Sequence, residues 1–404
     1  MMLQIKLKGM LILLHTSSLV CLTQSAAEDS VLSDVLLSTP GLARKYGYSV
    51  EEHTVQTEDG YLLTHFRIPH GRTNSTTEGK GPVILQHGQL CASDFWILNG
   101  QEKSLGFILA DAGYDVWLTN IRGNRHSRKH VTLPINSAQF WNFSWHEMGM
   151  YDMPATIDYI LATTGENRLS YISHSMGANM LLVMASMRPD YNDKLSVGFF
   201  LAPPVYLKNP KHPLLHVILP ISGLIGRVLT SLGIWELFPY SNKTARIVRT
   251  LCPEGALTHQ FCVLAYYTVY GEDSPQLNKT LLPVYIPHLL SGVSTKTLLH
   301  YSQLIKSGRF QQFDYGTKKN IEYYGQPSPP DYDVKKMTTP ISLYYGEGDP
   351  FVNPEGVKYL SELLPHLVSI NRAPPPKFNH NDPVFAIEAK QIVFDPILNV
   401  MKMY

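Results

Sequence analysis

Apolar and polar positions alternate with two different periods from about His53 onward. Two alternating segments flank the turn Glu58-Asp59-Gly60, which predicts a β-hairpin. Short apolar runs ending in turn residues predict buried strands at 82–88, 114–120, 168–173, near 196 and near 340. Amphipathic segments predict helices at 104–113, 153–165 and 177–187. Strands that alternate with helices indicate an α/β fold, in which a mostly parallel sheet is flanked by helices and functional groups gather at the carboxyl ends of the strands.

This rhythm stops between about Pro204 and Gly316. The segment is rich in Leu, Ile, Pro and Tyr, and its part 214–238 is predicted to be mainly helical and apolar. It is either a second core layer or a mainly helical cap, or lid, inserted between strands. Its position at a strand end favours the cap, because ligands bind at such ends. We therefore expect an α/β core at 28–203 and 317–404 with an inserted cap at 204–316.

The N-terminus has the order of a secretory signal peptide. Lys6 and Lys8 precede an apolar stretch that is too short to span a bilayer, and small residues follow at 25–27. We predict a signal peptide at 1–27, no transmembrane span, and a secreted or lysosomal protein; the alternative is a buried N-terminal helix.

Cysteines and sequons agree with export. Cys252 and Cys262 are close enough in sequence to close a small loop by a disulfide, whereas Cys91 is interpreted as a buried apolar residue. Glycosylation sequons occur at four positions: Asn74, Asn142, Asn242 and Asn278. Asn142 is the least favoured of them, because its aromatic surroundings FWNFSW look packed.

Composition excludes some classes of partner. Hydrophobic residues at 44% and charged residues at 17% describe an ordinary globular protein. The net charge of +1 gives no electrostatic footprint for nucleic acid. We predict no cofactor and no metal site, and the sequence does not indicate an oligomeric state.

The stretch Ser173-His174-Ser175-Met176-Gly177 resembles the G-x-S-x-G turn that presents a nucleophilic serine. A predicted strand precedes it and a predicted helix follows it, which is the context this turn requires. The sharp turn needs small residues two positions before and after the serine. Gly177 meets this need, and Ser173 replaces the first glycine with an expected small strain.

A nucleophilic serine needs a base and a carboxylate that orients the base, in the chain order Ser, Asp or Glu, His. Asp349 follows a predicted strand in a glycine-rich turn, and His380 lies in a later loop. The alternatives are an aspartate that caps the next helix and a surface histidine, with Glu347 as a rival acid.

The reaction also needs two backbone N–H groups that stabilise an oxyanion. Met176, directly after the serine, supplies one, and Gln89, after the strand ending in His87-Gly88, supplies the other.

With these residues in place, the chain resembles the acid lipase family, which contains the gastric and lysosomal acid lipases. The resemblance runs from about Gly47 to His380. It includes the segments YGYSVEEHTVQTEDGYLLTHFRIP, VILQHG, LADAGYDVWLTNIRGN, YDMPATIDYI, SHSMG, KSGRFQQFDYG, GEGDP and FNHND.

The resemblance implies an α/β-hydrolase fold whose inserted cap carries a lid that opens at a lipid surface. It implies Ser175 as nucleophile, Asp349 as orienting acid, His380 as base, oxyanion donors at Gln89 and Met176, and a disulfide between Cys252 and Cys262. Family members hydrolyse triacylglycerols or sterol esters, and several work at acidic pH.

Three positions depart from the family pattern, which usually reads G-H-S-Q-G and has Leu-Leu after HG. They are Ser173, Met176 and Gln89. We expect a serine lipase or esterase with an altered acyl preference, acting on neutral lipid esters at a lipid–water interface. The alternatives are a catalytically weak lipid-binding or storage protein and an acyltransferase that uses the same triad.

Overall fold

The computed structural model describes residues 31–72, 79–207, 210–271 and 273–404, with the backbone alone at 213–216. The predicted signal peptide 1–27 and the sequon at Asn74 lie outside the described residues.

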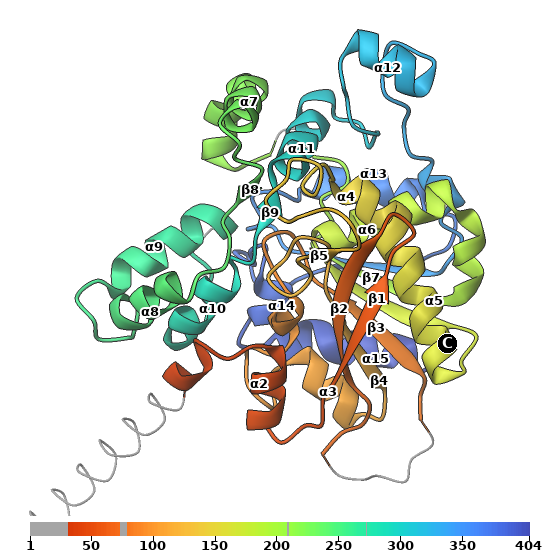
Figure 1. The fold of residues 1–404 in the computed structure, drawn as a ribbon. Coiled ribbons are helices and arrows are strands. Elements are labelled where there is room, and N and C mark those ends of the chain that lie inside the picture. Colours follow the sequence, from red (N-terminus) through yellow and green to blue (C-terminus); the bar gives the residue numbers. More distant parts are fainter. Residues whose placement is uncertain (1–30, 73–78, 208–209, 272) are drawn as a thin grey trace, which may run out of the picture.

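A nine-stranded sheet forms the centre of the described chain (Figure 1). Its strands are β1 (Glu51–Gln56), β2 (Tyr61–Ile68), β3 (Pro82–Gln86), β4 (Asp115–Thr119), β5 (Lys129–His130), β6 (Leu169–His174), β7 (Leu195–Leu201), β10 (Ile341–Tyr345) and β11 (Leu367–Arg372). The order is β1-β2-β4-β3-β6-β7-β10-β11, and β5 pairs with β2. Pairing is parallel from β4 to β11 and antiparallel at β1, β2 and β5. The predicted mostly parallel sheet is therefore confirmed, and β1 and β2 form the hairpin predicted around Glu58-Asp59-Gly60.

Helices cover both faces of the sheet because its strands are apolar on both sides. On β3, Val83 and Leu85 pack into one core layer and Ile84 into the other. The first layer is covered by α2 (Thr39–Lys45), α3 (Leu105–Asp111), α14 (Asp382–Phe385) and α15 (Asp395–Met401). The second layer is covered by α4 (Trp145–Glu147), α5 (Met153–Thr164), α6 (Met176–Met187) and α13 (Pro354–Leu363).

A mainly helical segment separates β7 from β10. Its elements are α7 (Pro213–Ser231), β8 (Glu236–Leu237), α8 (Asn242–Leu251), α9 (His259–Tyr270), α10 (Leu282–His288), β9 (Val293–Ser294), α11 (Thr295–Ser307) and α12 (Thr317–Tyr324). Figure 1 shows α7 to α11, in green to cyan, gathered beside and above one end of the sheet. The stretch 214–238 is mainly helical, as expected: α7 runs to Ser231, Gly233 with a φ of 71° follows its end, and the chain then pairs β8 with β9.

The chain changes direction at β3, which fixes where a site can form. From β3 the chain passes through α3 to β4 on one side, and it returns later to place β6 on the other side. The carboxyl ends of β3 and β6 are direct neighbours, with Gln86 paired to Ser173. Such a switch point opens a crevice at the strand ends.

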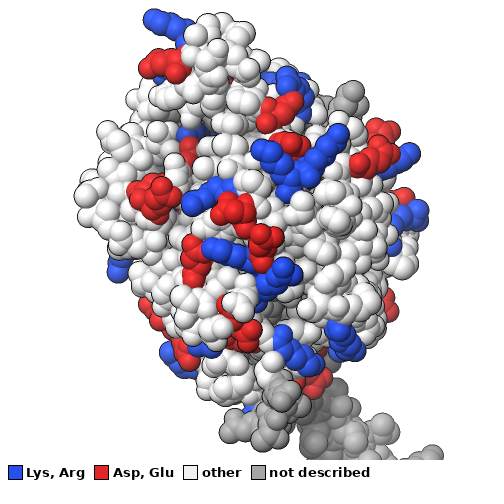
Figure 2. Space-filling model, turned by 90° about the vertical axis from the view of Figure 1, so that its right-hand side faces the viewer, with Lys and Arg blue, Asp and Glu red and all other residues white. Residues whose placement is uncertain are grey.

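The surface carries charges of both signs. Figure 2 shows acidic and basic side chains interspersed over the face that it presents. Within the described part of the chain, no helix combines the length and the apolar character needed to cross a bilayer.

His65 on β2 gives a test of how this core responds to pH. Its Nδ1 accepts the backbone N–H of Asn120 at 3.1 Å, and its Nε2–H donates to Thr156 on α5 at 2.9 Å. Burial lowers the pKa of His65 from 6.5 to about 3. Because the unfolded chain binds this proton first, the stability that neutral His65 contributes is lost as pH falls from the unfolded pKa toward the folded one.

We predict that His65→Asn is less stable than the parent at neutral pH but loses about 1.4 kcal/mol less per pH unit between about pH 6 and about pH 4. Thermal unfolding of both proteins across this range checks it. Parallel curves of Tm against pH for the two proteins would show that His65 does not cause this loss of stability.

Candidate active site

Ser175 sits on a strained turn between β6 and α6. Its φ of 53° and ψ of −120° lie outside the regions that L-residues favour, and the backbone N–H of Ser175 donates to the carbonyl of Leu201 at 2.8 Å. A Cβ on Gly88, after β3, would lie 2.8 Å from the Cβ of Ser175. Glycine at position 88 thus allows the loop after β3 to approach the serine.

Ser173 fits into the turn opposite Gly177. The Ser173 side chain is buried, and its hydroxyl donates to the carbonyl of Phe199 at 3.3 Å. A Cβ on Gly177 would lie 2.8 Å from the Cβ of Ser173 and 3.0 Å from the carbonyl oxygen of Gln86. The side chain of Ser173 fits at the position where the family has glycine because Gly177, which faces it, has no side chain.

Ser175, His380 and Asp349 form one hydrogen-bonded chain. His380 Nε2 lies 2.9 Å from Ser175 Oγ, and His380 Nδ1 lies 2.7 Å from Asp349 Oδ2. A carboxylate accepts hydrogen bonds, so Nδ1–H donates to Asp349 and Nε2 is left to accept from the serine hydroxyl. The structure thus brings together the three residues that the sequence indicated for this role.

The alternative interpretations of these residues do not hold. Asp349 caps no helix: Asn353 accepts the first-turn N–H of α13 at 2.6 Å, whereas Asp349 Oδ1 accepts the N–H groups of Phe351 and Val352. His380 is not on the surface, since it is only 5% exposed. The rival acid Glu347 points elsewhere and pairs with Arg372 at 3.1 Å.

Glycines hold the acid turn against the histidine loop. A Cβ on Gly346 would lie 2.1 Å from the carbonyl oxygen of Phe378, and one on Gly348 would lie 2.7 Å from the backbone of Lys377. Only residues without a side chain permit this approach, so the glycines of GEGD set the Asp349–His380 distance.

Two contacts that position His380 were missed by the sequence reasoning. The buried His174 donates its Nε2–H to the carbonyl of His380 at 2.8 Å, and the N–H of His380 donates to the carbonyl of Tyr270 at the end of α9. Burial lowers the pKa of His174 well below 6.5 and keeps the ring neutral. His174 stands directly before the serine in the motif, but no local pattern reveals its partner.

The candidate oxyanion donors, Gln89 and Met176, both have an unbonded backbone N–H within the described part of the chain. Gln89 and Ser175 line one cavity. Two free N–H groups beside a nucleophile are suited to an oxygen that gains negative charge.

An apolar cavity of about 520 Å³ opens at Ser175 and His380. Its wall from α7 and α11 includes Ile218, Leu219, Ile225, Leu229, Leu298 and Leu299. Cys91 is a buried residue of the same wall, and burial raises its pKa well above 9, which agrees with an unreactive apolar thiol.

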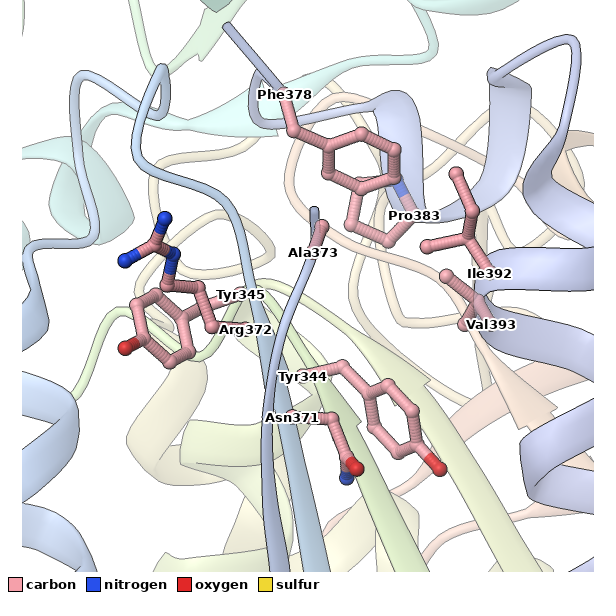
Figure 3. A pocket seen from close by; sticks show the side chains of 9 residues that line it. All are labelled: Tyr344, Tyr345, Asn371, Arg372, Ala373, Phe378, Pro383, Ile392 and Val393. Atoms are coloured by element: carbon pink, nitrogen blue, oxygen red, sulfur yellow. The ribbon is translucent and has the colours of Figure 1, made fainter. Parts of the chain in front are cut away.

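A much smaller cavity of about 20 Å³ is lined by residues on either side of His380 in the sequence, among them Phe378 and Pro383. Figure 3 shows Phe378 and, on α14, Pro383 lying above Ile392 and Val393, with Tyr344 below. The cavity has room for about one water molecule, which is too little for a substrate.

Cys252 and Cys262 are joined by a disulfide that links α8 to α9. Asn242 is exposed and Asn278 is half-buried. The expectation of a packed Asn142 was wrong: its neighbours Trp141 and Phe143 are buried, but Asn142 itself is exposed.

Comparisons with known proteins give the class. Residues 39–100 match the family model of a partial alpha/beta-hydrolase lipase region, and residues 81–214 match that of the alpha/beta hydrolase fold. The solved structure of DcsB with its substrate analogue covers 88% of this chain and 99% of its own at a TM-score of 0.52 and 11% identity, which is a likeness of fold alone. The chain is an α/β-hydrolase.

Closer relatives narrow the class. Lipase 1 of Drosophila melanogaster is 37% identical over 92% of this chain and 81% of its own length. The gastric triacylglycerol lipase of Bos taurus is 37% identical over 88% of this chain and 89% of its own. The chain belongs to the acid lipase family, which includes the gastric lipases, and is a carboxylic ester hydrolase.

The packing of Ser173 against position 177 gives a prediction. Gly177→Ala forces a Cβ into contact with Ser173 and Gln86, and we expect a loss of about 1–3 kcal/mol in the free energy of unfolding. Ser173→Gly in the same chain removes the tightest contact and should restore a large part of the loss. Chemical denaturation of the single and double variants measures both steps, and purely additive effects would show that the two positions do not interact.

Proposed function

We propose that this lipase hydrolyses carboxylic esters of neutral lipids through an acyl-enzyme formed on Ser175. The observation that carries the proposal is the Ser175–His380–Asp349 hydrogen-bonded chain at the mouth of a large apolar cavity. An intact chain of this kind supports turnover rather than passive lipid binding.

The reaction proceeds in two halves. Ser175 Oγ attacks the ester carbonyl while His380 Nε2 takes its proton, and the tetrahedral intermediate collapses as His380 returns that proton to the departing alcohol. Water then gives a proton to His380 and attacks the acyl carbon, so that the fatty acid leaves and Ser175 regains its hydrogen. Asp349 holds the Nδ1–H tautomer of His380 and stabilises the positive charge that the ring gains in each half.

The N–H groups of Gln89 and Met176 act as the oxyanion donors. Each donor of this kind typically contributes about 3–4 kcal/mol of transition-state stabilisation, because it is already oriented before charge develops. Backbone groups supply the hydrogen bonds, so the unusual side chains at positions 89 and 176 leave the donors in place.

The substrate is an ester with a long apolar acyl group. The cavity wall is formed mainly by aliphatic side chains from α7 and α11, and such a wall favours hydrocarbon over polar groups. The names of relatives such as gastric triacylglycerol lipase support a triacylglycerol or a related neutral ester. The segment 204–316 acts as the cap that supplies this wall and meets the lipid–water interface.

We assign the protein to a secreted or lysosomal location. The proposed signal peptide at 1–27, the disulfide between Cys252 and Cys262, and the exposed sequons at Asn142 and Asn242 all support passage through an oxidising, glycosylating compartment.

Ser175→Ala tests the nucleophile. We expect ester hydrolysis to fall by at least roughly 10⁴-fold while secretion and thermal unfolding are unchanged, because only the reacting oxygen is lost. A fluorophosphonate probe should label the parent and not the variant. Equal hydrolysis of a short-chain ester by both proteins would refute the assignment.

Leu229→Trp tests the acyl wall. A larger side chain fills part of the cavity, so kcat/KM for a long-chain ester should fall by roughly 10-fold or more while a short-chain ester is little affected. Val228→Trp is the matched control, because Val228 lies next to it on α7 but is 46% exposed. If both variants change the preference for acyl-chain length equally, the acyl group binds elsewhere.

A further inference from the structure

The loop after β3 has an unusual backbone directly beyond the proposed donor Gln89. Leu90 has a φ of 64°, in the left-handed region that a residue with a branched side chain rarely adopts. This conformation is unfavourable for a residue with a side chain and persists only where surrounding contacts enforce it. The loop therefore needs an external restraint to keep the N–H of Gln89 oriented.

The restraint comes from the segment that follows α10, far away in the sequence. The buried Ser291 donates its backbone N–H to the carbonyl of Leu90 at 2.9 Å. The Ser291 hydroxyl donates to the carbonyl of His288 at 3.2 Å, which ties the two ends of this turn together. One hydrogen bond thus fixes the strained residue itself.

A buried ion-pair cluster fixes the far end of the same loop. The Nδ1–H of His288 donates to Asp94 Oδ2, with both side chains fully buried, and Arg125 Nη2 lies 2.6 Å from the same oxygen. Burial alone would raise the pKa of Asp94, but Arg125 and His288 hold it far below its ordinary value. Arg125 also lies over the ring of Tyr240, 4.6 Å from its centroid, and so contacts the 204–316 segment directly.

Helix α10, which carries His288, is anchored to the core. The Tyr285 hydroxyl donates to Asn99 Oδ1 at 2.6 Å, and the Tyr285 ring stacks on Phe385 with centroids 4.3 Å apart. Leu282 and Val284 of the same helix are fully buried in the core layer. The restraint on the loop is therefore itself held in a fixed place.

We infer that His288 and Ser291 are positioning residues that hold the loop from Gln89 to Asp94 so that the Gln89 N–H points at the oxyanion. On this inference, part of the 204–316 segment completes the catalytic machinery in addition to lining the cavity. The inference rests on the proposed acyl-enzyme mechanism and concerns the transition state rather than substrate binding.

The test replaces His288 in the full-length secreted protein and uses a soluble short-chain ester. His288→Leu removes the donor to Asp94 and should lower kcat by roughly 10- to 100-fold with KM nearly unchanged, since a displaced donor is lost mainly in the transition state. His288→Asn places an amide N–H where Nδ1–H was and should retain most of the activity. Tyr285→Phe is the matched control: it removes the buried hydrogen bond to Asn99 but keeps the ring that stacks on Phe385, so α10 stays anchored and kcat should stay at the parent value.

The decisive measurement is the inhibition constant of an alkyl boronic acid, whose adduct with Ser175 occupies the oxyanion position. Activities are normalised to the concentration of phosphonate-titrated sites, so a smaller folded fraction does not count as a loss. We expect the boronate to bind the leucine variant more weakly by the same factor by which kcat/KM falls. If His288→Leu does not fold, His288→Gln, whose amide lies beyond the Nδ1 position, is measured in its place.

The inference is overturned if the leucine variant has the kcat and the boronate inhibition constant of the parent per titrated site. It is also overturned if the variant loses only titratable sites and each remaining site is as active as in the parent. These outcomes leave the proposed function intact as long as Ser175→Ala is inactive. Hydrolysis that survives Ser175→Ala would instead overturn the proposed function itself.

Discussion

The strained backbone of Ser175 is the constraint on which the rest of the structure depends. Its φ of 53° lifts the serine out of the sheet and aims it over the carboxyl ends of β3 and β6. That conformation is unfavourable by about 1–3 kcal/mol, so it needs neighbours that leave no alternative. The adjacent strand β7 fixes the N–H of Ser175, and the first turn of α6 fixes its carbonyl, which accepts the N–H of Ala178. The hydrogen bonds to β7 and to the first turn of α6 thus stabilise a backbone conformation that is unfavourable for an isolated serine.

Close backbone approach brings the remaining groups to this serine. Gly88 lets the loop after β3 reach the serine, and Gly346 and Gly348 let the acid turn reach the histidine loop. At the end of α9, the carbonyl of Tyr270 accepts the N–H of His380, and a Cβ on Gly271 would lie 2.4 Å from the carbonyl oxygen of Gly348. The helical segment between β7 and β10 therefore contacts both loops. A site assembled in this way tolerates changes in side chains, such as Ser173 for glycine, better than changes in backbone spacing.

The sequence predicted what depends on local pattern. Apolar runs gave the strands, the period of 3.6 gave α3, α5 and α6, and the turn residues around Asp349 and His380 placed them at strand ends. The contacts that hold these loops join distant segments: His174 and His380 are 206 residues apart, and Asp94 and His288 are 194 apart. No local period encodes such pairs. The prediction for Asn142 failed for a related reason: the aromatic side chains around it point into the core, whereas the asparagine side chain points outward.

The buried histidines around the site explain how His380 can act alone as a base. His87 and His174 lie in the same region, and burial lowers the pKa of His87 to about 4 and that of His174 well below 6.5. The Nε2–H of His174 donates to the carbonyl of His380, and the Nδ1–H of His87 donates to the carbonyl of Gly88. Each neutral ring thus uses its single N–H to bind the backbone of a loop at the site. An imidazolium in either place would repel the positive charge that His380 gains when it takes the serine proton. Burial thus lets these two rings orient the site as neutral donors, and the charge change of the reaction stays on the one histidine that faces both Ser175 and Asp349.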